Sequence, residues 1–580
     1  MARTRTGLAL ALLAGIAALS VATERRSQAL TLDEAGTINL GVRAYTDVRI
    51  HTQEYQCIRP DGSGYNGATF PCSPAGHLQQ SRWFLEMKWN HDLLKYVKDW
   101  LPGDTQVFAY NLTYRGEYEG IYDYGPSEYR NGRESLNEIE NAMRQGGVSE
   151  AAIQQNAGAI SLANRQKLRT IAVDRNRLFQ AFLDYEVGPF FVRFGRQNLA
   201  WGETDVFRLL DNINPIDNSF GGFFIDLDER RVPLDMLRSS YQLGDIGWFQ
   251  QAFFEGYVAD DNSVAFVPGS APGTAFYPPL GPPSSIIGRT QKDNPVSLNH
   301  VRGGGRLVAN LGDFTLGLAH YYTIFDLPAV RFRAPDFNGK DAGNPFIVPG
   351  VTQLVADQYG PHVQVTGGSF STAAPSLQSI FRGEFAFFRA EPLFRFATAS
   401  KFPGKGLSDP GFVQLVTQVL SGKFDTVSRK DTWNMALGWD MNQFIRPLNP
   451  NQSFFFTTQF FYKHVFSLDP LQAFPVPDAK RDPQRVIPYQ GDQFLYTLHV
   501  DTSYNHNLPF TNTNVVIAPS FNYFYDFVGA MLFQPGVRIS RDPWRFILDY
   551  SIVDSGVFRG TQIGLVRDRD NVRLQLEYVL

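Results

Sequence analysis

The fold is decided by the last ten residues, Asn571-Val572-Arg573-Leu574-Gln575-Leu576-Glu577-Tyr578-Val579-Leu580, in which polar and apolar residues alternate. A β-strand points successive side chains to opposite faces. The predicted strand therefore has an apolar wall, which runs from Val572 to Leu580, and a charged wall, which includes Arg573 and Glu577. The rest of the chain must supply surroundings for both walls.

A strand of this kind at the end of a chain is typical of the closing strand of an outer-membrane β-barrel. There the apolar wall faces lipid and the charged wall faces a water-filled lumen. Tyr578 supplies an aromatic residue third from the end, whereas Leu580 departs from the usual terminal Phe or Trp. We expect outer-membrane lipid around the barrel and the barrel assembly machinery as a partner.

The composition agrees with a barrel. The chain has 580 residues, a net charge of -4 and 14% aromatic residues, yet its mean hydropathy is only -0.22. Helical membrane proteins need long apolar runs, and none follows the N-terminal run. No basic cluster of the kind that binds nucleic acid is present, so nucleic acid is not expected as a partner. The alternative class is an ordinary secreted β-protein.

The same alternation recurs along the chain from Ile38 onward. Long connections lie near 51–80, 119–175, 200–233, 259–298, 327–376, 400–431 and 468–492, and short turns lie near 188, 245, 312, 448, 508 and 542. Outer-membrane barrels have short periplasmic turns and long outer loops. We therefore predict that residues 30–580 form an all-β, large antiparallel transmembrane β-barrel of about 16–18 strands.

Two segments depart from the strand pattern. Residues 135–169 are rich in Ala, Gln, Asn and Glu, which predicts a partly helical insertion in a long loop. Residues 195–233 carry Gly, Pro and Asn where a strand would exclude them, which predicts an irregular loop in the lumen or its mouth. The acidic residues of this segment fit no known calcium loop, so we expect a solvated acidic surface. They are Asp205, Asp211, Asp217, Asp226 and Asp228.

The N-terminus is predicted to be a Sec signal peptide, residues 1–29. Arg3 and Arg5 precede an apolar run that is too short for a membrane anchor. Small residues offer cleavage points at Ser20-Val21-Ala22 and at Ser27-Gln28-Ala29, of which we take the second. The expected location is the cell outer membrane.

Only two cysteines, Cys57 and Cys72, are present. In an exported chain we expect them to form one disulfide across a glycine-containing loop, the alternative being two unpaired thiols. The chain has no G-x-S-x-G, H-E-x-x-H, Walker loop or paired CxxC motif. We therefore expect no catalytic residues, no cofactor and no metal. An outer-membrane lipase, whose triad need not be local in sequence, remains the enzymatic alternative.

Several charged residues fall on predicted inward faces: Arg43, Arg49, Arg193, Arg382 and Glu384. Either these side chains select a solute, or they only keep the lumen wall hydrated and pair with charges on neighbouring strands. Phe84, Phe191, Phe461 and Phe524 also fall on inward faces. A purely aqueous pore gains little from such aromatics, so they either contact an apolar solute or pack a loop folded into the lumen.

Residues 201–217 are the main functional candidate, because an amphipathic loop inside a wide barrel can constrict it. The alternative is a surface loop packed on its neighbours. The residues that we expect at the lumen or the constriction are Arg43, Arg193, Arg196, Trp201, Glu203, Asn214, Asp217, Arg382 and Glu384.

At this loop the sequence resembles the Gram-negative outer-membrane proteins labelled domain of unknown function 1302. The resemblance rests on Gly195-Arg196-Gln197, on Trp201-Gly202-Glu203 and on Asn212-Ile213-Asn214-Pro215-Ile216-Asp217. Arg382-Gly383-Glu384 and Val232-Pro233 are similar too, whereas the cysteine pair and the Leu580 ending are not part of the pattern. The resemblance implies passage of a hydrophobic or amphiphilic molecule, and an inner-membrane exporter system as a partner.

We therefore expect a passive channel or transporter for a hydrophobic or amphiphilic small molecule, lipid-like or sterol-like. A general hydrophilic porin is one alternative and predicts a polar constriction with few inward aromatics. A structural or assembly barrel with a sealed lumen is another, and predicts loops that fill the barrel.

Overall fold

The computed structural model describes residues 30–53, 74–130, 140, 144, 149–168, 173–260, 286–290, 301–325, 329–336, 338–339, 341–342, 354–395, 417–418, 421, 425, 427–469, 473–478, 482–507, 514–555, 563 and 569–580. The predicted signal peptide, Cys57 and Cys72 lie outside these residues.

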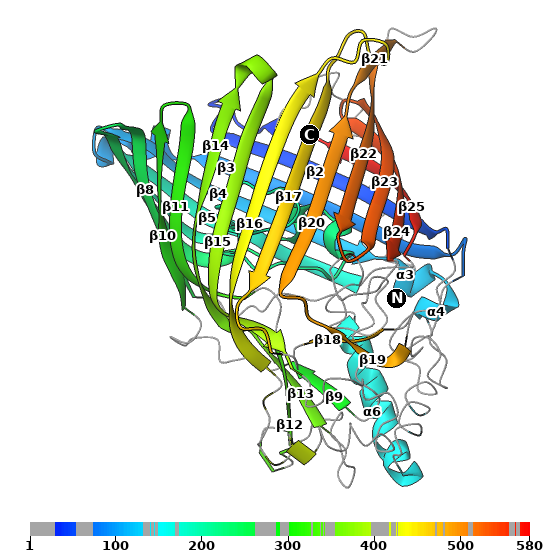
Figure 1. Ribbon diagram of the computed structural model, residues 1–580. Coiled ribbons are helices and arrows are strands. Elements are labelled where there is room, and N and C mark those ends of the chain that lie inside the picture. Colours follow the sequence, from blue (N-terminus) through cyan, green and yellow to red (C-terminus); the bar gives the residue numbers. More distant parts are fainter. Residues whose placement is uncertain are drawn as a thin grey trace.

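Eighteen antiparallel strands form a closed barrel, which confirms the predicted fold class (Figure 1). The first and last strands close it, since Arg43 pairs with Val579 and His51 with Asn571. In order around the wall the strands are β2 (Ile38–His51), β3 (Leu78–Asp92), β4 (Thr105–Glu119), β5 (Asp174–Val187), β6 (Phe190–Gln197), β7 (Leu234–Ile246), β8 (Phe249–Asp260), β10 (Val301–Leu311), β11 (Phe314–Ile324), β14 (His362–Ala374), β15 (Ser379–Phe394), β16 (Val427–Gln443), β17 (Phe454–Val465), β20 (Asp492–Asp501), β22 (Asn514–Asp526), β23 (Ala530–Arg541), β24 (Trp544–Ser555) and β25 (Asn571–Val579).

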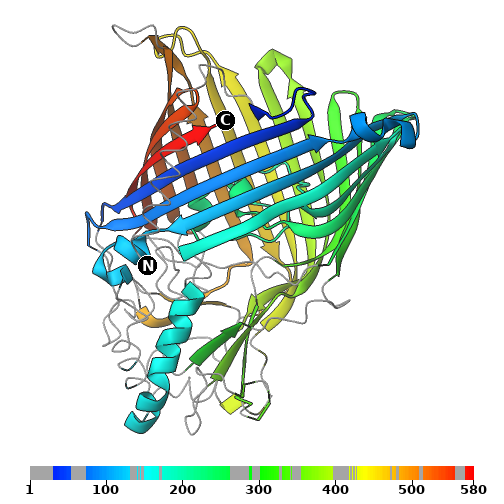
Figure 2. The same ribbon diagram turned by 180° about the vertical axis from the view of Figure 1, so that it is seen from behind.

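Short helices and strands lie at the two ends of the barrel. At the end with the long loops, small sheets and the longest helix extend away from the wall (Figure 2). These are β9 (Ile286–Thr290), β12 (Ala329–Arg333), β13 (Leu354–Tyr359), β18 (Ala473–Asp478), β19 (Asp482–Pro488) and α6 (Glu150–Leu168). The remaining short elements are β1 (Leu30–Thr31), β21 (Tyr504–Asn507), α2 (Leu94–Val97), α3 (Ile121–Tyr124), α4 (Ser127–Arg130), α7 (Leu227–Arg230), η1 (Lys98–Trp100), η3 (Gly222–Phe224) and η5 (Pro375–Leu377).

The two faces of the wall differ as the alternation predicts. On β25, Leu574 and Leu576 point outward and are 36% and 43% exposed, whereas Gln575 and Glu577 point inward and are buried. The outer face exposes many other large apolar side chains, among them Phe194 and Leu318. An apolar exterior around a polar interior is what a lipid-embedded barrel requires. Among the described residues, no helix is long and apolar enough to cross a membrane.

Two details of the connections differ from the sequence-based prediction. The predicted long connection 327–376 contains a wall strand, β14, and the short turn after it. This strand was missed because its sequence, HVQVTGGSFSTAA, carries small and polar residues on its outward face. On the long-loop side, β22 and β23 are joined by only residues 527–529. Helix α6 lies within the predicted insertion 135–169.

Candidate functional site

Residues 198–233, which we call the lumen loop, connect β6 to β7 and lie inside the barrel rather than above it. The middle of the loop is joined to its C-terminal end. Asp217 N–H donates to the Arg230 carbonyl at 2.7 Å, and Val232 N–H donates to the Pro215 carbonyl at 2.8 Å. An isolated bridge joins Ile216 to Arg231. The loop is therefore a folded unit with a narrow neck.

Asn214 holds this neck together and is completely buried. Its amide oxygen accepts the Leu199 N–H at 2.8 Å, and its amide nitrogen donates to the Val232 carbonyl at 2.9 Å. One side chain thus satisfies backbone groups at both ends of the loop, which would otherwise be buried without partners.

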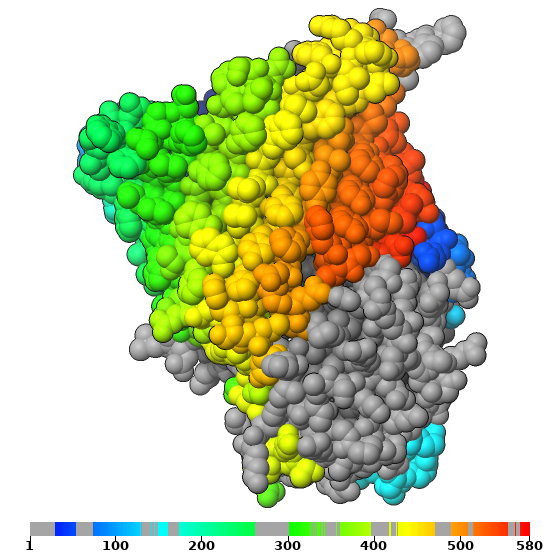
Figure 3. All heavy atoms as spheres, in the orientation of Figure 1, coloured from blue at the N-terminus to red at the C-terminus, as the bar shows by residue number. Residues whose placement is uncertain are grey.

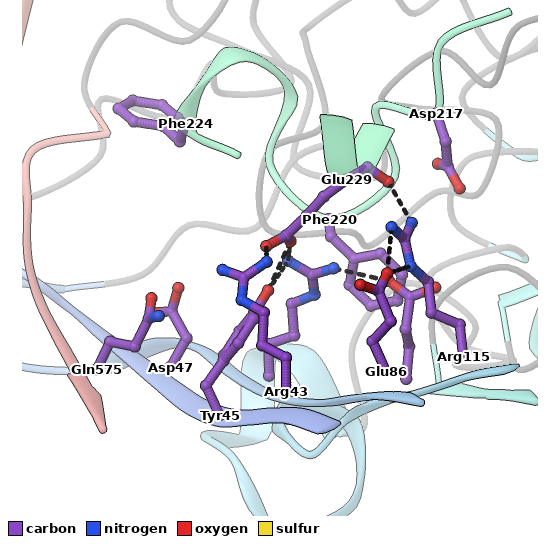
Figure 4. Close-up of polar contacts among 12 residues, drawn as sticks. Arg43, Tyr45, Asp47, Glu86, Arg115, Asp217, Phe220, Phe224, Glu229 and Gln575 are labelled. Atoms are coloured by element: carbon purple, nitrogen blue, oxygen red, sulfur yellow. Dashed lines mark hydrogen bonds and ion pairs between the residues drawn. The ribbon is translucent and has the colours of Figure 1, made fainter. Parts of the chain in front are cut away.

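On one side of the lumen, Glu229 of α7 binds the wall (Figure 4). Its carboxylate accepts hydrogen bonds from Arg43 at 2.7 Å, from the Tyr45 hydroxyl at 2.7 Å and from Arg82 at 3.0 Å. Arg43 also pairs with Glu577, and Arg82 also pairs with Glu117. The loop therefore completes a network of charges that begins on β2, β3 and β25.

Neighbouring contacts extend this attachment. Arg115 of β4 donates to the Glu229 carbonyl at 2.8 Å and pairs with Glu86 of β3. Gln80 donates to the Phe220 carbonyl at 2.6 Å. Asp217 accepts a hydrogen bond from Arg175 of β5 at 2.5 Å. Bonds to charged groups are stronger than neutral ones, so this side of the loop is firmly held.

On the opposite side, Glu384 of β15 binds the loop through its backbone. The carboxylate accepts the N–H groups of Thr204 at 3.0 Å and of Leu210 at 3.1 Å, and also that of Glu203. Gly202 leaves room for this approach, because a Cβ there would lie 3.1 Å from the Glu384 carboxylate. Both residues belong to the motifs that carry the family resemblance.

Arg382, two residues earlier on the same strand, contacts the loop as well. It donates to the Glu203 carbonyl and to the Asp205 carboxylate, and it pairs with Asp440 of β16 at 2.9 Å. The Arg-Gly-Glu sequence of β15 thus presents one cation and one anion to the same turn of the loop.

Trp201 anchors the start of the loop. Its indole Nε1 donates to Glu255 of β8 at 2.9 Å, and its ring packs edge-on against Tyr257 and Tyr321. Tyr321 in turn donates to the Leu210 carbonyl at 2.7 Å. These residues belong to an apolar cluster that joins the loop to β8, β11, β14 and β15.

Aromatic contacts connect the middle of the loop to the wall. Phe207 packs edge-on against Phe461 and Phe524, each with ring centroids 5.8 Å apart. Phe223 contacts Phe524 as well. Phe461 and Phe524 are two of the inward aromatics identified in the sequence, and both pack against the loop.

The charges of the loop respond to these surroundings. Burial opposes ionisation of Glu229, but Arg82 and Arg43 outweigh it and lower the pKa of Glu229 to about 2. Arg175 and Arg177 likewise outweigh burial and lower the pKa of Asp217 to about 2. At Asp211 burial prevails over Arg208 and Arg231, so its pKa is raised. The attachment of the loop is therefore ionic at neutral pH through Glu229 and Asp217.

The Gly-Arg-Gln motif shapes the strand that leads into the loop. Gly195 has a φ of 125°, and a Cβ there would lie 2.3 Å from the Ala181 carbonyl oxygen, so only glycine fits. Gln197 is completely buried and donates to the Met236 carbonyl at 3.2 Å. Gly195 and Gln197 thus fix the end of β6 against its neighbours.

Residues 3–580 match the family described as "Protein of unknown function (DUF1302)". The chain belongs to this family. In this DUF1302 chain, the motif residues Gly202, Asn214, Asp217 and Glu384 are residues that fix the lumen loop. No curated relative matches the sequence.

Solved structures of similar fold are outer-membrane proteins. The OmpF complex with daunomycin of Salmonella typhi has 10% identity and a TM-score of 0.35, covering 95% of this chain and 100% of that chain. OccAB4 of Acinetobacter baumannii has 9% identity and a TM-score of 0.38, covering 96% and 100%. OprB of Pseudomonas putida has 9% identity and a TM-score of 0.37, covering 94% of each chain. With TM-scores below 0.5, they carry no argument about function.

The structure places most of the predicted site residues in the lumen, in two groups. Arg43 and Asp217 lie on the Glu229 side. On the β8–β15 side lie Trp201, Glu203, Arg382 and Glu384. Asn214 holds the neck of the loop between the two groups. Arg193 lines the wall, paired with Asp184 at 2.6 Å, and its side chain makes no hydrogen bond or ion pair to the described residues of the loop.

Two expectations are wrong. Arg196 faces outward, because it alternates with inward-facing Gln197 and pairs with exposed Asp235 at 2.8 Å. The expected solvated acidic surface is wrong for Asp211 and Asp217, which are buried and bound by arginines, whereas Asp205, Asp226 and Asp228 are exposed. The side chain of Asp228, which pairs with Arg231, is 88% exposed.

Glu229 and its partners Tyr45 and Arg82 were not among the site residues predicted from the sequence. A signal was available, because Arg82, Glu86, Arg115 and Glu117 all fall on the polar faces of adjacent strands. Such a group of inward charges needs partners in the lumen, and the Asp-Glu-Arg-Arg run 228–231 was the nearest unassigned charge cluster.

Proposed function

We propose that this barrel is a passive outer-membrane channel for a hydrophobic or amphiphilic small molecule, with the lumen loop as its constriction. The observation that carries the proposal is the path of residues 198–233, which bind β2–β5 on one side of the lumen and β8, β11, β15 and β17 on the other. A solute that passes through the barrel must pass this loop.

The chemistry of the loop favours an amphiphilic solute. Phe207 and Phe223 are only half-buried and lie beside inward-facing Phe461 and Phe524, while ionic groups flank them on both sides. Aromatic surface beside fixed charges suits a molecule with one apolar and one polar part. A hydrophilic porin gains nothing from such aromatics.

The strand register gives a direct test. Gln197 of β6 pairs with Leu234 of β7, so a tight Asn-Gly turn can replace residues 198–233 without moving either strand. A matched control replaces 325–361 in the same way, because Ile324 pairs with His362. Ion conductance in planar bilayers and flux of a membrane-impermeant amphiphilic steroid acid are then measured for each protein.

We expect small ion conductance but measurable amphiphile flux through the intact protein, and large steady conductance only when the lumen loop is replaced. Large steady conductance through the intact protein would favour a general hydrophilic porin. If the protein without the lumen loop shows neither ion conductance nor amphiphile flux, a sealed structural barrel is favoured. The same conclusion follows if replacing residues 325–361 raises the ion conductance as much as replacing the lumen loop does.

A further inference from the structure

The outer wall contains a cavity of about 400 Å³ near the long-loop end of four adjacent strands. β11, β14, β15 and β16 follow one another in the wall and run side by side across the green-to-yellow surface of Figure 3. The cavity is lined by Tyr322, Gly360, Pro361, His362, Gln364, Arg389, Ala390 and Arg429.

The cavity opens outward and not to the lumen. Tyr322 is 41% exposed, whereas its neighbour Tyr321 is completely buried in the lumen. Tyr322 pairs with Gln364, and Gln364 pairs with Arg389, so these residues form one row across three strands. A bulge at Ala390, with a φ of 65°, follows Arg389 and turns Glu391 into the lumen.

The cavity carries two arginines, and no carboxylate of the described residues forms an ion pair with either. The side chain of Arg389 is exposed and makes no hydrogen bond or ion pair within the part of the chain that the structure describes. Arg429 is exposed too, and within the described residues its side chain donates one hydrogen bond, to the His362 carbonyl at 2.7 Å. The carboxylate of Asp431 accepts the Ala390 N–H at 3.0 Å. Arg196, elsewhere on the outer wall, has its own carboxylate partner instead.

The position of the cavity matches the edge of a bilayer. Phe385 and Trp433 stack on the outer face with ring centroids 5.7 Å apart, and such aromatic girdles mark the membrane interface. Arg389 lies four residues beyond Phe385 toward the long loops, which is roughly 13 Å along the strand. That places its guanidinium among lipid headgroups, not among acyl chains.

We propose that this cavity binds the phosphate of a phosphorylated glycolipid in the leaflet on the long-loop side. The proposal rests on the proposed location in the outer membrane, with the long loops outside. Two guanidinium groups bind phosphate oxygens through charge-assisted, bidentate hydrogen bonds. Tyr322 and Gln364 supply a hydroxyl and an amide for sugar hydroxyl groups. The acyl chains would lie along exposed Phe385 and Leu437.

Binding is tested on the purified full chain in detergent. Native mass spectrometry and a thermal-shift titration use bisphosphorylated lipid A, the same lipid without phosphates, and inorganic phosphate as a competitor. The variants are Arg389→Gln alone and together with Arg429→Gln. The matched control is Arg196→Gln, which removes the same charge from the outer wall. Because the exposed side chain of Arg389 makes no hydrogen bond or ion pair to the described residues, we expect its substitution to leave the fold intact.

We expect bisphosphorylated lipid A to bind, with at least a fivefold loss of affinity in Arg389→Gln, a larger loss in the double variant and less than a twofold change in Arg196→Gln. Equal binding by all variants, or equal binding of the lipid without phosphates, would overturn the proposal. Displacement of the lipid by millimolar inorganic phosphate would instead show a site for soluble phosphate and overturn the lipid assignment. Conductance is not part of this readout, so the proposal can fail or stand independently of the channel function.

Discussion

The substitution Glu229→Gln tests whether the lumen loop is attached to the wall by charge. It replaces one carboxylate oxygen with an amide nitrogen. The variant keeps the shape of the side chain but removes the charge that Arg43, Tyr45 and Arg82 bind. The wild-type carboxylate has its pKa lowered from 4.5 to about 2. Since one pKa unit corresponds to 1.36 kcal/mol, the charge stabilises the attached loop by about 3 kcal/mol.

A loss of about 3 kcal/mol raises the population of detached loop roughly 100-fold. Local opening of this kind appears directly in hydrogen exchange of backbone amides. We expect peptides that cover 214–232 to exchange roughly 100-fold faster in Glu229→Gln, while peptides from β10 and β11 stay protected. Tyr45→Phe removes one hydrogen bond to the same carboxylate and is expected to cost about 1 kcal/mol.

Asp228→Asn is the matched control, because Asp228 lies on the same short helix but its side chain is 88% exposed. We expect its exchange to equal that of the wild type. Wild-type exchange in Glu229→Gln, or equal acceleration in both variants, would refute the assignment of Glu229 as an anchor of the loop.

Three further outcomes follow from the structure. Glu384→Gln weakens the acceptor of three backbone N–H groups, so exchange at 203–210 should rise at least tenfold while 217–230 stays protected. Glu229 and Asp217 have lowered pKa values, so their stabilisation is present above a pH of about 4.5 and is lost as the pH falls toward 2; single-channel recordings should show openings that increase over that window. Gly195→Ala should lower the yield of heat-modifiable folded barrel several-fold, because of its φ of 125° and its contact with the Ala181 carbonyl, whereas Gly103→Ala, which has open space around its Cβ position, should fold as the wild type.

Strands with regular alternation were predictable because their pattern is local. Ile38–His51 and Asn571–Val579 match the predicted segments closely, since each strand must show lipid one face and the lumen the other. β14 failed this test because Gly368 and Thr366 occupy its outward face. Its place in the wall comes from pairing with β11 and β15, which no local pattern records.

The candidate site was predictable in part. Trp201, Asn214 and Glu384 were identified through the motif in which they stand, yet the motif could not say what they bind. Arg196 was misassigned against the alternation itself. It lies three residues after inward-facing Arg193 on β6, whose pairing with β5 and β7 has no bulge, so its side chain belongs to the outward face.

The sequence by itself determined that the chain closes into a barrel with an apolar exterior, because alternation with a period of two is a property of neighbouring residues. Only the tertiary structure decided that residues 198–233 lie across the lumen. The bonds that hold them join Glu229 to Arg43, 186 residues apart, and Thr204 to Glu384, 180 residues apart. Such partners are remote in sequence and lie side by side only in the folded barrel, where they satisfy each other's buried charges and backbone groups.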